Sequence, residues 1–99
     1  MTQPELLALR DRIDEIDERL VGLRADRFDV TEAIGRLKAE AGAKPVDPSR
    51  EREQGRRYEA LAQSHGLDPA LVQQVFRTII DEVVRRHAAL VARADSAQD

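Results

Sequence analysis

The sequence predicts an all-α protein with three helices, one of them very long. Three observations carry this prediction. Apolar residues, 41% of the 99, recur at alternating spacings of three and four, which only a helix places on one face. Aromatic residues make up 3% and charged residues 35%, a composition that disfavours a sheet. Two Asp-Pro pairs, at 47–48 and 68–69, mark helix starts. The length allows one domain, residues 1–99.

The first helix is predicted from about residue 5 to 41. Pro4 suits the first turn, and Gly42 followed by Pro45 ends the segment. Glycine disfavours a helix interior, so Gly22 and Gly35 indicate close backbone contacts. The apolar face consists of Leu6, Leu9, Ile13, Ile16, Leu20, Leu23, Val30, Ile34 and Leu37.

Two shorter helices follow the long one. Asp47 is the expected N-cap of a helix over about 48–64, which Gly66 terminates. A third helix is predicted over about 69–94, with a frayed polar tail at 95–99. The second helix carries few apolar residues, so we expect Tyr58 to serve in packing.

The length of the first helix predicts a second copy of the chain. At 1.5 Å per residue this helix is roughly 55 Å long, whereas a compact monomer of this size is about 33 Å across. A single copy would expose the apolar face over several turns. We therefore expect an intertwined helical homodimer; the alternative is a monomeric bundle with the helix kinked at Gly22 or Gly35.

Composition excludes several classes of function. With no cysteine and two histidines, a metal site is not expected, and no glycine-rich phosphate loop indicates a cofactor. The 14 arginines and 2 lysines are interleaved with acids, so no basic patch for nucleic acid is expected. The first twenty residues are too charged for a signal peptide, and no apolar run suits a membrane. These features predict a cytoplasmic protein.

The first helix carries cationic residues on a face that is otherwise apolar. Arg27 occupies the apolar register between Leu23 and Val30, so it either pairs with a carboxylate, Asp26 or Glu51, or awaits an anionic ligand. The sequence leaves both open. Lys38 projects from nearly the same face about 16 Å away.

Arg10 lies too far along the helix to join this pair within one chain, but it reaches a partner's site if the long helices run antiparallel. Alternatively, Arg10 and Lys38 are rim residues whose stems cover the core edges.

Acceptors and one histidine lie on the other two helices. Asp47 and Glu51 are four residues apart and share a face, either as a cap followed by a surface acid or as acceptors for a ligand hydroxyl. His87 interrupts the apolar stripe after Val83, as a core residue or as a ligand-binding one.

These positions together resemble the all-helical class of chorismate mutases over nearly the whole chain. The resemblance rests on Leu-Leu-Ala-Leu-Arg10, Arg27, Ile-Gly-Arg-Leu-Lys38, Pro-Val-Asp47-Pro-Ser-Arg50-Glu51 and Phe76-Arg-Thr-Ile-Ile80. It implies a cofactor-free rearrangement of the dicarboxylate chorismate to prephenate, in the shikimate pathway to aromatic amino acids. It also implies a homodimer with two shared active sites.

The resemblance implies a role for each residue. Arg27 and the neighbouring chain's Arg10 would bind the substrate carboxylates, and Lys38 would donate to the ether oxygen. Asp47 and Glu51 would accept from the ring hydroxyl, while Arg50 would order the helix start.

Two positions depart from the family pattern, which commonly has serine at Val83 and glutamine at His87. Valine removes a contact to the ring carboxylate, whereas a histidine N–H replaces the amide donor. These changes leave open an isochorismate pyruvate-lyase or aminodeoxychorismate mutase on the same scaffold. A non-catalytic helical dimerisation module is the third possibility.

Overall fold

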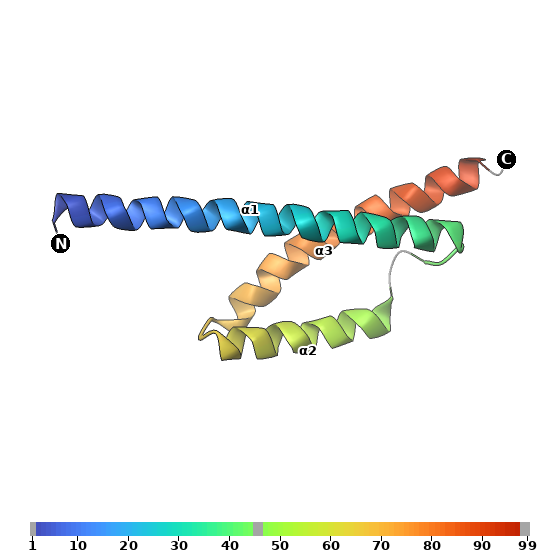
Figure 1. Ribbon diagram of the computed structural model, residues 1–99. Coiled ribbons are helices and arrows are strands. Elements are labelled where there is room, and N and C mark those ends of the chain that lie inside the picture. The colour runs from blue at the N-terminus through green and yellow to red at the C-terminus, as the bar shows by residue number, and fades with distance from the viewer. Residues whose placement is uncertain (1, 45–46, 98–99) are drawn as a thin grey trace. The chain divides into compact units, whose positions relative to one another are not determined.

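A computed structural model describes residues 2–44 and 47–97, and all of the regular structure in these ranges is helical. Helices α1 (Gln3–Glu40), α2 (Pro48–Ser64) and α3 (Pro69–Ala97) follow one another along the chain (Figure 1). The predicted all-α class and helix count are confirmed. The chain divides into two compact units, one up to Thr31 and one from Glu32 onward.

Helix α1 has defined caps at both ends. The Thr2 backbone N–H donates to Glu5 Oε2 at 3.0 Å and the Glu5 N–H donates to Thr2 Oγ1 at 3.3 Å, a capping box that starts the helix two residues before the predicted position. At the other end Gly42 has φ +68°, and the Ala43 N–H donates to the Lys38 carbonyl at 2.8 Å. Helix α1 continues without interruption through Gly22 and Gly35.

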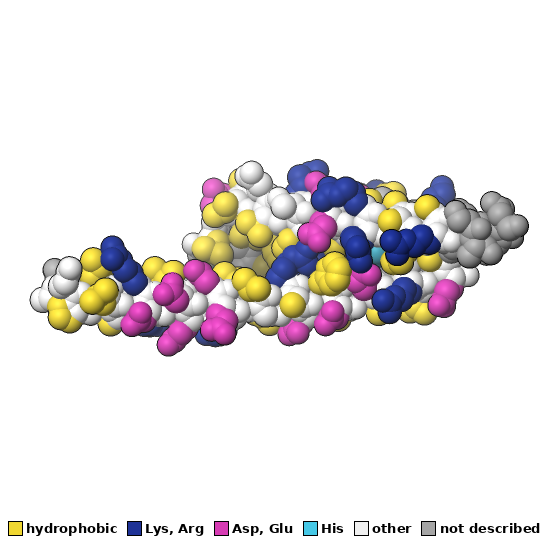
Figure 2. All heavy atoms as spheres, turned by 90° about the horizontal axis from the view of Figure 1, so that it is seen from above, with side chains coloured by type: hydrophobic (Ala, Val, Ile, Leu, Met, Phe, Trp, Pro, Cys, Tyr) yellow, Lys and Arg dark blue, Asp and Glu magenta, His cyan; other side chains and the backbone are white. Residues whose placement is uncertain are grey.

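The N-terminal unit is the first part of α1 and exposes its apolar face. Ile13 is 56% exposed, Leu20 59% and Leu23 64%, and none of the described side chains in this unit is buried. Apolar side chains lie beside acidic ones on the face of this segment that Figure 2 shows at the left. Within residues 2–44 and 47–97, no helix combines the length and hydropathy needed to cross a membrane.

The second unit contains the packing of α2 on α3. The rings of Tyr58 and Phe76 stack with centroids 3.9 Å apart and planes at 5°, and Tyr58 and Ala62 are almost fully buried. Gln73 Nε2 donates to the Gly55 carbonyl at 2.7 Å. The predicted packing role of Tyr58 is therefore confirmed.

The sequence signals at the ends of α2 and α3 act as predicted, with one exception. Asp47 Oδ1 accepts from the backbone N–H groups of Ser49 and Arg50 at 3.1 and 3.3 Å. Gly66 has φ +68°, and the N–H of the next residue donates to the Ala62 carbonyl at 2.8 Å. Asp68 Oδ1 accepts from the Ala70 N–H at 3.0 Å.

The exception is the C-terminus of α3. This helix continues to Ala97, so the predicted frayed tail is wrong for residues 95–97. Residues 98 and 99 lie outside the described residues.

Candidate active site

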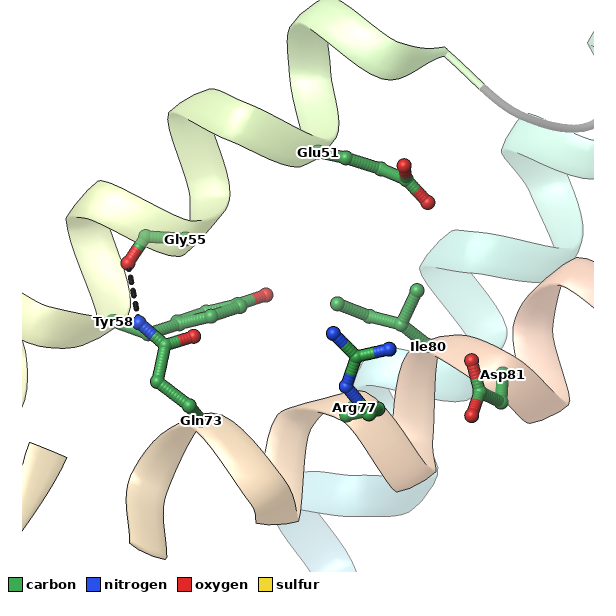
Figure 3. A pocket seen from close by; sticks show the side chains of 7 residues that line it. All are labelled: Glu51, Gly55, Tyr58, Gln73, Arg77, Ile80 and Asp81. Atoms are coloured by element: carbon green, nitrogen blue, oxygen red, sulfur yellow. Dashed lines mark hydrogen bonds between the residues drawn. The ribbon is translucent and has the colours of Figure 1, made fainter. Parts of the chain in front are cut away.

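A pocket of about 220 Å³ lies between α2 and α3 (Figure 3). Helix α2 contributes Glu51, Gly55 and Tyr58, and α3 contributes Gln73, Arg77, Ile80 and Asp81. The Glu51 carboxylate and the Arg77 guanidinium approach the pocket from opposite helices (Figure 3). Glu51 is thus a predicted site residue that the structure places in a cavity.

Sequence reasoning missed Arg77 and Asp81. They are four residues apart on α3 and lie on the pocket side together with Ile80. Their spacing was a visible signal, but it does not say which neighbouring helix they face. With Glu51 they give the pocket one cation and two carboxylates beside a phenol and an amide, a lining suited to a small polar molecule.

Asp47 is held at the start of α2 by its two capping hydrogen bonds. This is the capping interpretation that the sequence left open beside hydroxyl binding. The neighbouring Arg50 forms an ion pair with Glu53, with Nη1 2.9 Å from Oε1. Both interactions stabilise the start of α2, whose first turn carries Glu51.

Lys38 and Val83 are partly buried, the first in the last turn of α1 and the second on α3. His87 is buried, with 4% of its surface exposed, and its ring lies against Gly35. The close contact predicted at Gly35 is therefore confirmed. At Gly22 an added Cβ would meet no atom of the described residues within 4 Å, so the contact predicted there is not found among them.

Arg10 and Arg27 belong to the N-terminal unit. Arg10 is exposed, whereas Arg27 is partly buried and its Nη1 is shielded from solvent. Arg24, three residues earlier and on the same face, has the same shielding and was not singled out from the sequence. The convergence of Arg10 and Arg27 with Lys38 stays a prediction.

An ion pair joins α1 to α3 beside His87. Arg86 Nε donates to Glu32 Oε1 at 2.9 Å, and the Glu32 side chain is 12% exposed. This hydrogen bond lowers the pKa of Glu32 below its ordinary value of 4.5, against partial desolvation, which raises it. The positive charges of Arg86 and Arg36 lower this pKa further.

The pair predicts a pH-dependent stability. A carboxyl with a lowered pKa stabilises the fold above its unfolded pKa, and the contribution is lost as the pH falls through the folded value. Arg86→Gln should therefore lower the urea midpoint at neutral pH, and the two midpoints should converge as the solution is acidified below the ordinary value of 4.5. Arg85→Gln, which removes the same charge from the adjacent exposed position, is the control. A pH-independent difference would contradict the expectation.

Comparison with known proteins places the chain in a family. The family model described as chorismate mutase type II matches residues 9–88. The chain is 34% identical over 86 residues to the bifunctional chorismate mutase/prephenate dehydratase of Escherichia coli (strain K12), covering 87% of the chain and 22% of that protein. It is 29% identical over 77 residues to the chorismate mutase of Methanocaldococcus jannaschii, covering 78% of each chain.

The chain therefore belongs to the chorismate mutase type II family. It spans about a fifth of the length of the bifunctional relatives. The match to the chorismate mutase of Methanocaldococcus jannaschii covers the same share of both chains. The resemblance inferred from the sequence is confirmed at the level of the family.

Proposed function

We propose that the chain is a chorismate mutase that rearranges chorismate to prephenate in one intramolecular step. One observation carries this proposal: the segment matched by the family model, residues 9–88, contains all seven predicted substrate-binding residues. These residues are Arg10, Arg27, Lys38, Asp47, Glu51, Val83 and His87. The polar pocket beside Glu51 supports it.

The reaction needs the substrate to be held in a folded conformation, because the carbons that form the new bond must meet. A dicarboxylate is held best by two guanidinium groups, each able to donate two parallel hydrogen bonds to a carboxylate. In the proposed site Arg27 binds one carboxylate and the neighbouring chain's Arg10 binds another. Fixing both ends converts a flexible molecule into one poised to react.

Lys38 is the proposed source of transition-state stabilisation. As the carbon–oxygen bond of the enolpyruvyl ether breaks, negative charge grows on the ether oxygen. A fixed ammonium interacts with that charge more strongly in the transition state than in the ground state, which is the condition for faster turnover. The backbone of Lys38 is well positioned for this role: the residue is in the last turn of α1, and its carbonyl accepts from the Ala43 N–H.

Glu51 and Asp47 are the proposed acceptors for the ring hydroxyl. Glu51 lines the pocket, which supports this role directly. Asp47 already accepts two backbone hydrogen bonds through Oδ1, so its contact with the substrate would add to its capping function. A carboxylate has capacity for about four hydrogen bonds in total, which leaves room for the hydroxyl.

A homodimer completes the proposed site. The N-terminal unit exposes Leu and Ile side chains along one helix, and soluble proteins cover contiguous apolar surface of this kind with a partner. In an intertwined pair the long helices cover one another, and each brings its Arg10 to the partner's site. The dimer and the shared site are thus one proposal.

The test is a direct assay of the purified chain with chorismate. The reaction is monitored by the loss of chorismate absorbance and by the detection of prephenate. Isochorismate and the amino analogue of chorismate are run in parallel, because Val83 and His87 depart from the pattern of the resemblance. Turnover of chorismate alone supports the mutase. Release of pyruvate from isochorismate would instead support the lyase, and no turnover by a folded dimer would leave a dimerisation module.

His87 should contribute to turnover as a hydrogen-bond donor. Its ring N–H would donate to the ether oxygen. His87→Ala should lower kcat, with His65→Ala as the control. Full activity of His87→Ala would remove His87 from the site.

A further inference from the structure

The His87 ring fits against a place on α1 where a side chain is missing. A Cβ added to Gly35 would lie 2.8 Å from His87 Nε2, closer still to His87 Cδ2, and 3.0 Å from Leu90 Cδ1. Real Cβ atoms essentially never show contacts under 3.0 Å, so the ring and an alanine methyl group cannot both occupy these positions. Gly35 is itself buried, and His87 is 4% exposed.

This fit distinguishes Gly35 from the other glycines inside helices. At Gly22 on α1 and Gly55 on α2, an added Cβ would meet no atom within 4 Å in the part of the chain that the structure describes. Glycine disfavours the middle of a helix, so its presence at a buried position has to be explained by what lies opposite. At Gly35 that neighbour is the imidazole of His87.

The electrostatic surroundings point to the same turn of α1. Glu32 lies one turn before Gly35 and forms its ion pair with Arg86, the residue that precedes His87. The charge of Arg36 also acts on this carboxylate. Glu32 and Arg36 on α1 and Arg86 on α3 are thus charged residues that neighbour Gly35 or His87 along their helices.

We propose that Gly35 is a positioning residue for His87: the space left by its missing side chain receives the imidazole and sets where Nε2 points. This inference rests on the proposed function for the part that concerns catalysis. The ring is the end of a side chain that turns about two bonds, so an alanine at position 35 displaces the ring rather than the backbone. Displacement of a donor by about 1 Å is enough to slow a reaction strongly.

The first test reads the ring directly. The chain has two histidines, so the imidazole NMR signals of His65 are an internal reference for those of His87. Gly35→Ala should shift the His87 ring signals and leave those of His65 in place. Gly22→Ala, the matched substitution in the same helix, should shift neither. Unchanged His87 signals in Gly35→Ala would overturn the proposal.

The second test is a thermal double-mutant cycle with His87→Ala. Replacing a helical glycine by alanine ordinarily raises the melting temperature by about 4 to 8 °C in a chain of this size. We expect a rise of that order from Gly35→Ala in the His87→Ala background and a smaller rise, or a fall, when His87 is present. Equal changes in both backgrounds would overturn the proposal. If Gly35→Ala alone does not fold, folding of the double variant supports it and failure of the double variant overturns it.

The third test separates positioning from packing. Gly35→Ala should lower kcat for chorismate about 10-fold to 100-fold with little change in KM. Gly35→Ala/His87→Ala should be no slower than His87→Ala alone, because the group being positioned is gone. A KM effect without a kcat effect would contradict a positioning role. A wild-type chain inactive on chorismate would overturn the proposed function, whereas the NMR and thermal results would still decide the fit of Gly35 to His87.

Discussion

Lys38→Ala should lower kcat for chorismate by about 10² to 10³, the usual effect of removing one preorganised donor from developing negative charge. The loss should fall mainly on kcat, because the ammonium acts on the ether oxygen most strongly in the transition state. Measurement of kcat and KM by chorismate absorbance checks both statements.

The sequence provides a matched control for this substitution. Lys44 is the other lysine of the chain and lies beyond the end of α1, in an exposed position. Lys44→Ala removes the same charge and should retain activity. Circular dichroism should show both variants to be as helical as the wild type. Comparable activity of Lys38→Ala and wild type would contradict the proposed mechanism at its main electrostatic step.

Mixing two inactive variants should restore activity. Arg10→Ala and Lys38→Ala each damage every site of their own homodimers. If each site takes Lys38 from one chain and Arg10 from the other, a mixed dimer contains one intact site and one with both lesions. Random reassortment after joint unfolding and refolding should therefore return about one quarter of the wild-type activity.

The control for this experiment is a mixture of Arg27→Ala with Lys38→Ala. Both residues are proposed to come from the same chain of a site, so each mixed dimer would carry one lesion in each site and no intact site. This mixture should stay inactive after the same refolding. Recovery in both mixtures, or in neither, would contradict a site shared between chains in the proposed way.

Helix ends were the most predictable part of the fold. Asp47 and Gly66 are where the sequence placed a cap and a stop, because both roles follow from local backbone chemistry. The sequence predicts too early an end for α3, because the mostly polar composition after Ala94 is typical of a frayed tail. No glycine or proline follows Pro69 in the sequence, so no residue there terminates the helix before Ala97.

The residue types of the candidate site could be predicted from the sequence, but the contacts between its helices could be predicted less well. Glu51 was found from its spacing to Asp47, and it lines the pocket. Arg77 was missed because what it faces depends on how α3 packs on α2, which no local spacing encodes. Gly35 and His87 were each singled out, one as a costly glycine and the other as a polar residue in an apolar stripe. Their contact joins positions far apart in sequence and emerges only from the structure.

In the proposed homodimer, the exposed apolar face of the N-terminal segment of α1 would tie folding to concentration. A helix whose apolar side chains contact no other part of its own unit has little beyond its backbone hydrogen bonds to hold it, and isolated helices are marginal in water. If a second copy covers that face, separating the two copies also removes the packing that keeps the segment helical. Dilution would then melt the segment and dismantle both sites in one step, so that activity and helicity decline along the same curve.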